Sequence, residues 1–319
     1  MPTAEQLKAL VKAHYEPTND KFTTITLQIA AHEAKLGHIN LADEIKKIID
    51  KAKQFRPKLQ TINNDLQGLL IEAKPICRLS DLILPDKIIE RIKRIEKEFI
   101  QKEKLRHHDL KNRRKILFSG PPGTGKTMTA YVIAHELNMP LNIILIDKLV
   151  TKFMGETSAK LRQVFDYIRD NQAVYLFDEF DAIGTERAKD NDIGEMRRVL
   201  NSFLQFIEQD ESGSIILAAT NNLALLDQAL FRRFDDVIHY QLPDDTEKAR
   251  LIENKIGNYI GNFNIIDIVS KIGNLSHSEI TQACNDAVKE AILSNKNKIE
   301  EEELMKMIEE RKSVYRKGR

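Results

Sequence analysis

GPPGTGKT occupies residues 120–127, between a short apolar run at 115–119 and a segment of helical character at 128–134. Strand, glycine-rich loop and helix in this order are the context that a phosphate-binding loop requires. Glycines remove the Cβ atoms that would obstruct a phosphate, and backbone N–H groups and the helix N-terminus then face the anion. A tight turn with a chance lysine is the alternative, but every position of the motif is filled. We therefore predict that Lys126 reaches the β- and γ-phosphates of a nucleotide and that the Thr127 hydroxyl holds Mg²⁺.

A second apolar run, at 173–177, leads directly into two acidic residues. Its unbroken apolar sequence, with β-branched and aromatic members, is typical of a buried parallel strand. Open α/β sheets place their ligands at the carboxyl ends of such strands. We predict that Asp178 contributes to the Mg²⁺ site and that Glu179 orients and deprotonates the attacking water. The alternative is that the two acids cap the following helix.

A third apolar run, at 214–219, ends at Thr220 and Asn221. An amide at the tip of this strand can contact the γ-phosphate or the lytic water, whereas the alternative is a turn-forming asparagine. Further along the chain, Arg232 and Arg233 precede an aromatic residue. Two such arginines usually cover a surface. They can instead project into the nucleotide site of a neighbouring subunit and stabilise the charge of the transition state.

These segments together resemble one module of the AAA ATPases, within the AAA+ superfamily, over residues 79–293. The resemblance rests on four segments in the family's order and spacing: GPPGTGKT at 120–127, VYLFDEFDAIG at 174–184, ILAATNN at 216–222 and LDQALFRRFD at 226–235. It implies an α/β fold in which a P-loop NTPase parallel sheet is flanked by helices. A C-terminal helical lid and a small N-terminal helical bundle complete the expected architecture.

The resemblance also implies an ATP hydrolase with ATP and Mg²⁺ as cofactors. Asn221 would be the sensor residue and Arg233 the arginine finger, acting with Lys126 and Glu179 in catalysis. Many members carry a second arginine where this chain has Asp236. The arginine-finger role is therefore assigned to Arg233, and whether Arg232 contributes stays open. The metal would be held by Thr127 and Asp178. The expected nucleotide-binding residues are Asp81, Leu82, Ile83, Pro122, Gly123, Thr124, Gly125, Lys126, Thr127 and Met128.

A motor also needs a grip on its substrate, and the resemblance points to residues 152–155. In AAA unfoldases the loop that faces a central pore reads aromatic, hydrophobic, glycine. This chain has Phe153, Met154 and Gly155 there, with Lys152 in front. A bulky apolar side chain on such a loop pushes a passing peptide without reading its sequence. The alternative is that Phe153 and Met154 pack into the core at the start of the next helix.

Helical spacing and breaks, together with what the AAA resemblance implies for the ATPase subdomain and the lid, divide the chain into four expected parts. Residues 1–60 form a bundle of about three helices that binds a substrate or adaptor, and 61–78 form a linker. Residues 79–243 form the large α/β ATPase subdomain. Residues 244–319 form the helical lid, with helices expected at 246–256, 265–272, 278–293 and 300–311. In some AAA+ branches a lid arginine contacts the γ-phosphate, but the corresponding turn at 274–279 has none, as in the AAA branch proper.

Composition excludes several classes of function. The formal net charge is +1, so no global charge draws the chain to nucleic acid or to an anionic membrane. No apolar stretch reaches the length of a membrane span, and no export signal is evident. Cys77 and Cys284 lack the spacing of metal ligands and fit a reducing compartment. We therefore expect a cytoplasmic protein with no membrane partner and no indicated nucleic-acid partner.

The function expected from these features is a ring-forming Mg-ATP motor, a homo-oligomer and in the family a hexamer, that unfolds or remodels protein substrates through a central pore. The chain has no His-Glu-x-x-His, so it lacks zinc protease chemistry. Stand-alone bacterial ATPases of similar layout are often encoded beside a subtilisin-like serine protease, which makes a separate protease partner an expectation. The alternative is a nucleotide-switched DNA-processing helper, a loader or a transposition or replication accessory. That class would carry a basic stripe or a DNA-binding helical motif, and neither is evident.

Overall fold

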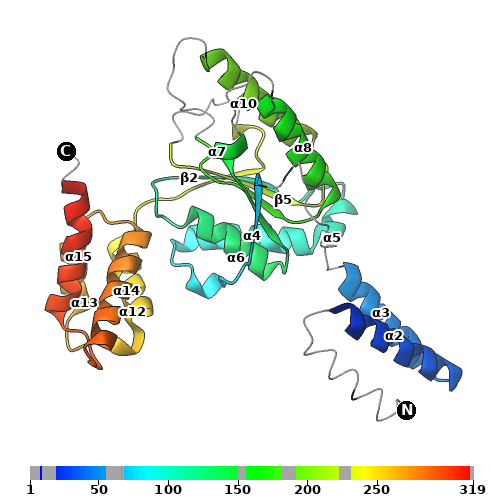
Figure 1. The fold of residues 1–319 in the computed structure, drawn as a ribbon, viewed down its shortest axis with the longest axis horizontal. Coiled ribbons are helices and arrows are strands. Elements are labelled where there is room, and N and C mark those ends of the chain that lie inside the picture. The colour runs from blue at the N-terminus through cyan, green and yellow to red at the C-terminus, as the bar shows by residue number, and fades with distance from the viewer. Residues whose placement is uncertain are drawn as a thin grey trace. The chain divides into compact units, whose positions relative to one another are not determined.

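The computed structural model describes residues 19–54, 68–149, 156–181, 192–222 and 231–316, together with Lys8 and Leu66. Its contacts divide the chain into two compact units, Met1–Leu59 and Gln60–Arg319. Figure 1 shows the helical first unit in blue, and the second unit from cyan to red.

The first unit is a helical hairpin in its described part. It consists of α2 (Asn19–Lys35) and α3 (Ile39–Gln54), joined by a short turn. Ile29, Ala30 and Ala42 are buried between the helices. The first of the three helices expected here lies outside the described residues, apart from Lys8.

The second unit is built on a six-stranded sheet in the order β1-β3-β4-β5-β2-β6. All neighbours pair in parallel except β1 and β3, which are antiparallel. The apolar runs predicted three of these strands, β2, β4 and β5, and the structure confirms them. The strands are β1 (Leu70–Ala73), β2 (Lys115–Ser119), β3 (Leu141–Ile144), β4 (Val174–Phe177), β5 (Ile215–Thr220) and β6 (Asp236–His239).

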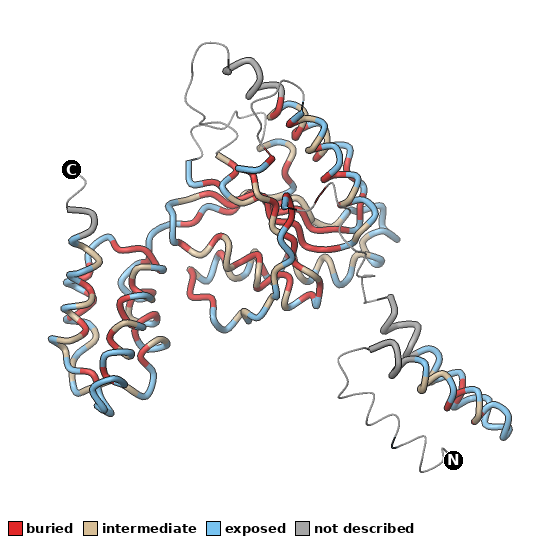
Figure 2. The backbone as a smooth tube through the Cα atoms, in the orientation of Figure 1, coloured by how far each residue is buried: buried red, intermediate tan, exposed pale blue. Residues whose placement is uncertain are grey.

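Helices cover both faces of this sheet, which explains the unbroken apolar strands. Along β5, Ile216 packs into the cluster on one face, and Ile215 and Leu217 pack into the cluster on the other. Successive side chains of a strand point to opposite faces, so a strand that is covered twice must be apolar throughout. Figure 2 shows the central strands buried along their length. The predicted α/β fold is therefore confirmed.

The covering helices form one layer on each side of the sheet (Figure 1). One layer contains α4 (Asp86–Ile100) and α6 (Lys126–Glu136), and the other contains α8 (Glu156–Asp170) and α10 (Asp192–Gln209). The short helices α5 (Lys102–Arg106) and α7 (Ile146–Leu149) complete the described part of these layers.

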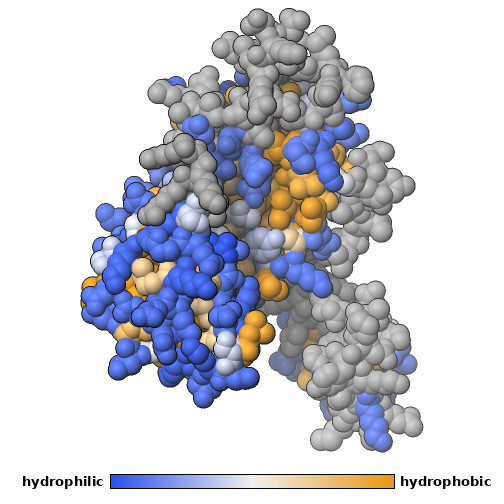
Figure 3. Space-filling view, turned by 60° about the vertical axis from the view of Figure 1, so that its left-hand side comes forward, coloured by the Kyte–Doolittle hydropathy of each residue, from blue (hydrophilic) through white to orange (hydrophobic). Residues whose placement is uncertain are grey.

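A separate apolar core holds four C-terminal helices together. They are α12 (Asp245–Ile256), α13 (Ile265–Ile272), α14 (His277–Leu293) and α15 (Glu301–Arg316). The first residue of each helix lies within one residue of a helix start expected from the sequence. Ile83 from the sheet subdomain is buried in the same cluster, so the segment before α4 packs against these helices. The surface of this helical part that faces the viewer in Figure 3 is largely hydrophilic.

One strand lies where the sequence analysis expected a linker. Residues 61–78 contain β1, which adds an antiparallel edge to the sheet and hydrogen-bonds β3. Leu70 is buried and Ile71 is exposed in this four-residue strand. A strand this short carries too few alternations to stand out in the sequence.

Candidate active site

The carboxyl ends of β2, β4 and β5 meet at one edge of the sheet because these strands are parallel neighbours. The GPPGTGKT loop follows β2, the two acids follow β4, and Asn221 follows β5. A pocket of about 450 Å³ lies at this edge. Its volume falls in the range of small-molecule sites. The lining residues are Asp81, Leu82, Ile83, Leu84, Pro122, Gly123, Thr124, Gly125, Lys126, Thr127, Met128, Asp178, Glu179, Asn221, Leu251, Lys255, His277, Ser278 and Thr281.

All ten residues that the sequence analysis assigned to nucleotide binding line this pocket, as do Asp178, Glu179 and Asn221. Six lining residues were not anticipated. They are Leu84 and five residues of the C-terminal helices: Leu251, Lys255, His277, Ser278 and Thr281. The turn at 274–279 has no arginine, and His277 is the residue within it whose side chain could have indicated a pocket position.

The glycine-rich loop adopts backbone conformations that other residues disfavour. Gly123 and Gly125 have φ angles of 72° and 100°. At Gly120 a Cβ atom would lie 2.2 Å from the main-chain oxygen of Tyr240, so only glycine fits beside β6. Gly125 caps α6 at its N-terminus, and Lys126 is the first helical residue. The loop therefore delivers the helix N-terminus to the pocket, which is the arrangement that binds phosphate.

Lys126 is 6% exposed and lies between the loop and the end of β5. Its Nζ donates to the main-chain oxygens of Gly120 and Pro121 at 2.7 and 2.8 Å, and to Asn221 Oδ1 at 2.9 Å. Burial lowers the pKa of Lys126, and the carboxylates of Asp178 and Asp181 act in the opposite direction. The structure thus joins the lysine of the glycine-rich loop and the amide predicted at the tip of the third apolar run.

Thr127 and Asp178, the predicted metal ligands, are in direct contact. Thr127 Oγ1 donates to Asp178 Oδ2 at 2.8 Å. Among the described residues no group of three His, Cys, Asp or Glu side chains could hold a metal ion. A magnesium ion needs no such group, because it commonly uses one or two protein oxygens together with waters and substrate phosphates. The hydroxyl and carboxylate at this edge have the oxygen chemistry that Mg²⁺ prefers.

Glu179 has a strained backbone. Its φ angle is 52°, in the left-handed region that costs a residue with a side chain about 1–2 kcal/mol. Two contacts hold the turn in place: Glu179 N donates to Asp178 Oδ1 at 2.9 Å, and Phe180 N donates to the Ala219 oxygen at 2.8 Å. The side chain itself is exposed. Strain that the surroundings enforce is a feature of functional positions.

The lining of the pocket is shared by the sheet subdomain and the C-terminal helices, and both contribute apolar side chains. Leu82 and Leu84 each approach the Cβ position of Gly125 to 3.8 Å, and Leu251 lines the pocket from α12. The main-chain N–H of Ser278, in α14, donates to the Gly123 oxygen at 2.9 Å. The helical part therefore contacts the phosphate-binding loop directly.

Arg233 does not line the pocket. Its Nε lies 3.2 Å from Glu208 Oε2 at the end of α10. Asp235, two residues further along the chain, is hydrogen-bonded to the start of β2. Its main-chain N–H donates to the Lys115 oxygen at 2.8 Å. Its Oδ2 accepts from the main-chain N–H groups of Arg114 and Lys115 at 2.9 Å each. The glycine-rich loop leaves the other end of β2. A five-residue strand separates its ends by about 13–17 Å, so Arg233 sits at the edge opposite its own pocket.

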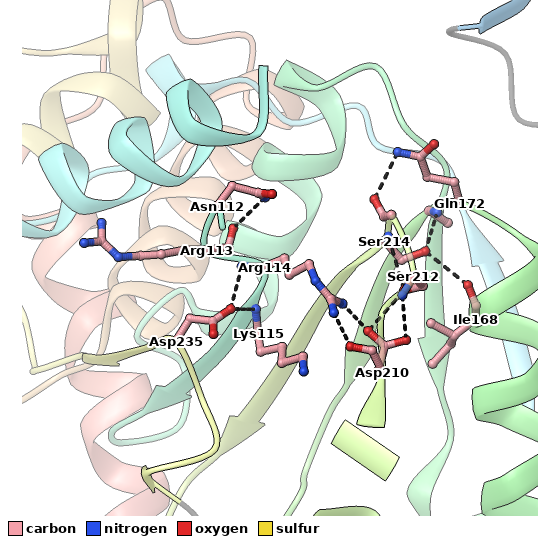
Figure 4. A network of polar contacts seen from close by, with 12 residues as sticks. Asn112, Arg113, Arg114, Lys115, Ile168, Gln172, Asp210, Ser212, Ser214 and Asp235 are labelled. Atoms are coloured by element: carbon pink, nitrogen blue, oxygen red, sulfur yellow. Dashed lines mark hydrogen bonds and ion pairs between the residues drawn. The ribbon is translucent and has the colours of Figure 1, made fainter. Parts of the chain in front are cut away.

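Paired charges close that opposite edge (Figure 4). The Arg114 guanidinium donates to both the carboxylate and the main-chain oxygen of Asp210. The Asp210 side chain is 3% exposed, and its carboxylate also accepts from Ser212. Arg114 and Asp210 are thus paired where both are largely buried, which makes the pair a structural anchor of the sheet.

The proposed pore residues Lys152, Phe153, Met154 and Gly155 lie outside the described residues. Their role stays a prediction. Residues 182–191, which follow β4, and residues 223–230 also lie outside the described residues.

Residues 116–242 match the ATPase family associated with various cellular activities (AAA). These residues form an AAA ATPase domain. The matched range spans β2 to the residues after β6 and so contains the glycine-rich loop, both acids, Asn221 and Arg233. ATP hydrolysis is therefore the reaction of this chain.

Curated relatives agree with this family. An uncharacterized AAA family ATPase of Sinorhizobium fredii is 29% identical over 97% of this chain and 96% of its own length. The ATP-dependent zinc metalloprotease FtsH 2 of a Thermoanaerobacter species is 31% identical over 70% of this chain and 45% of the relative. The proteasome-activating nucleotidase of Methanoculleus marisnigri is 32% identical over 61% of this chain and 49% of the relative. The chain thus spans less than half the length of these last two proteins.

Hydropathy gives one further result for the described helices. None of them combines the length and the apolar character that crossing a bilayer requires.

Proposed function

We propose that this AAA ATPase is a ring-forming, Mg-ATP-driven motor that unfolds or remodels protein substrates through a central pore. One observation carries the proposal: the pocket lies at the carboxyl end of β2, and the arginine that would complete it lies at the amino end. A single subunit therefore holds two halves of a site that face in different directions.

Within the pocket, each group has a role that its position supports. Lys126 binds the β- and γ-phosphates, and the backbone of the glycine-rich loop surrounds them. Thr127 and Asp178 hold Mg²⁺, which neutralises charge on the phosphates when it is bound. Glu179 orients and deprotonates the water, and Asn221, 2.9 Å from Lys126 Nζ, fixes the γ-phosphate or that water.

Leu82 and Ile83 support the adenine end of the pocket, with Asp81 at its rim. Ile83 is also buried in the core of the C-terminal helices, so the base would lie at the seam of the two parts. We accordingly propose that residues 244–319 act as a lid on the ATPase subdomain at 79–243. Residues 1–60 would bind a substrate or adaptor, and 61–78 would connect them.

The position of Arg233 favours a homo-oligomeric ring. A finger that cannot reach its own pocket serves a neighbour, and repeated head-to-tail contact of this kind closes into a ring. The stoichiometry we propose is a hexamer. Arg233 would leave Glu208 and meet the neighbour's nucleotide, where it stabilises charge in the transition state.

Protein is the proposed substrate. Two relatives bear the names of a protease and of a proteasome-activating nucleotidase, and the loop at 152–155 has the composition of a substrate-gripping loop. A separate protease would then do any cutting, since this chain has no His-Glu-x-x-His. The proposed location is the cytoplasm.

Phe153→Ala tests the pore. Loss of the ring should leave ATP hydrolysis within about twofold of wild type and abolish remodelling of a protein that copurifies with the Glu179→Gln form. A buried Phe153 would instead cost about 3–5 kcal/mol of stability on truncation. A large drop in melting temperature with loss of all activities would therefore contradict the pore assignment. Unchanged remodelling would contradict it as well, and ATPase stimulation by DNA would favour a DNA-processing helper.

A further inference from the structure

An ion pair links α4 to the strand that follows Arg233. The Arg91 guanidinium, in the second turn of α4, donates through Nη2 to the carboxylate of Asp236, the first residue of β6. The same nitrogen donates to the main-chain oxygen of Val237 at 2.7 Å. The side chains of Arg91 and Asp236 are 35% and 17% exposed, so the pair is partly shielded from solvent. Neither residue lines the nucleotide pocket, and the pair therefore needs an explanation outside it.

The chain just before β6 is held from several directions. Asp235 is hydrogen-bonded to the start of β2, and Phe234 is buried in the cluster on the face that α8 and α10 cover. Arg91 comes from the opposite helical layer, because its neighbours Ile88 and Ile92 belong to the other cluster. β6 lies at an edge of the sheet and pairs with β2. Arg91 thus supports this edge strand at a side chain and at the main chain.

The support lies close to Arg233. Arg233 is three residues before Asp236, and three residues of chain span at most about 11 Å. A shift at the start of β6 is therefore carried to the residues before it. In catalysis, misplacement of a contributing group by about 1 Å can lower the rate about 10²-fold. Small changes in the position of this segment therefore matter for a finger.

Arg233 also has a contact that it must give up to act on a neighbour. Its Nε lies 3.2 Å from Glu208 Oε2, and the Glu208 side chain is 64% exposed. In the proposed ring, Arg233 exchanges this carboxylate for the nucleotide of another subunit. Its position then depends on how firmly the backbone of its own segment is held.

We propose that Arg91 is a positioning residue for the arginine finger. By binding Asp236 and Val237, it holds the segment at 232–235 so that Arg233 meets the nucleotide of a neighbouring subunit. This inference rests on the proposed function, in which Arg233 acts in trans. It assigns Arg91 to the finger half of the site, although α4 begins two residues after Leu84 of the pocket lining. A change at Arg91 should therefore harm the neighbour's site and spare the subunit's own pocket.

Mixed rings of full-length chains separate these two halves. The reference mixture combines Lys126→Ala with Arg233→Ala, so every complete site takes its pocket from one chain and its finger from the other. In the finger mixture, Arg91→Met is added to the Lys126→Ala chain. In the pocket mixture, Arg91→Met is added to the Arg233→Ala chain instead. The recovered ATPase rate should fall about tenfold below the reference in the finger mixture and stay within about twofold of it in the pocket mixture.

Two further changes, made in the finger mixture, check the cause of that deficit. Arg94→Met removes an exposed arginine from the same helix and should leave the reference rate unchanged. Arg91→Met combined with Asp236→Asn removes the pair without leaving an unpaired carboxylate, and the deficit should persist. Full recovery with this combination would overturn the inference, because the deficit would then come from the unpaired Asp236. An equal deficit with Arg94→Met would overturn it too.

A purely structural role for Arg91 gives a different pattern. It predicts equal deficits in the finger and pocket mixtures, and that result would overturn the inference, as would a finger mixture that matches the reference. A deficit that follows from fewer mixed assemblies, measured by light scattering with differential tags, would overturn it as well. Failure of the proposed function is distinguishable, because the reference mixture itself would then recover no activity.

Discussion

The charged side chains near the two ends of β2 lie in different environments. At the carboxyl end, Lys126 and Glu179 stand at a pocket, and Glu179 has a strained backbone. At the amino end, Arg114 and Asp210 are paired and largely buried, and the chain that carries Arg233 is tied to the strand by Asp235 (Figure 4). One end retains groups that a ligand can use, and the other end fixes a segment in place. The difference shows that the strand serves as a spacer between two half-sites.

The largest expected effect is at the pocket end. Glu179→Gln should lower the rate of ATP hydrolysis by about 10²–10⁴, because the amide cannot take the proton of the attacking water. ATP binding should stay near the wild-type value, since Lys126 and the loop are intact. Steady-state phosphate release and equilibrium binding of a fluorescent analogue measure the two quantities. Hydrolysis within twofold of wild type would move the base to another residue.

At the amino end of β2, substitution is expected to lower the free energy of unfolding. Asp210→Asn leaves the buried Arg114 guanidinium without its charge partner, and breaking such a pair costs about 3–5 kcal/mol. Urea unfolding measures the change in the free energy of unfolding. The control is Asp166→Asn, which breaks an exposed pair with Arg169 and should cost under about 1 kcal/mol. Equal effects of the two substitutions would show that the network at the amino end is no anchor.

A pH titration tests the lid side of the pocket. The pKa of His277 is about 4 in the folded protein and near its ordinary value of 6.5 in the unfolded chain. The unfolded chain therefore binds the extra proton between these values, and the stability present above pH 6.5 is lost as the pH falls toward 4. For this one group the loss between pH 7 and pH 5 is about 2 kcal/mol. Unfolding of wild type and His277→Leu at both pH values isolates it, and identical pH dependence would show that His277 is not buried in the free protein.

The sequence predicted the elements whose signal is local. GPPGTGKT contains its own turn chemistry, and the runs at 173–177 and 214–219 are apolar because both faces of their strands are covered. β4 is equally short, but all four of its residues are apolar. β1, β3 and β6 each include a polar residue (Glu72, Asn142 and Asp236), and β1 and β6 lie at the sheet's edges, so their patterns are weaker and these strands were missed.

The same distinction between local signals and tertiary packing applies to the pocket residues. Residues on the glycine-rich loop and at strand ends were found, because motif and position give their chemistry. His277, Lys255 and Thr281 were missed, because packing of the lid against Gly123 and Ile83 brings them to the pocket. The partner of Arg233, Glu208, lies 25 residues away in the sequence and carried no signal either.

The central claim is that one ATPase site combines the carboxyl end of β2 in one subunit with the amino end of β2 in its neighbour. Mixing two inactive variants tests this claim. Lys126→Ala removes the pocket half and Arg233→Ala removes the finger half. Each alone should hydrolyse ATP at a small fraction of the wild-type rate, and Arg233→Ala should still bind ATP. In mixed rings, about a quarter of the interfaces pair an intact pocket with an intact Arg233, so ATPase activity should reappear and peak near equal amounts. No recovery at any ratio, with mixed assemblies confirmed by light scattering and differential tags, would contradict the account, as would a fully active monomer.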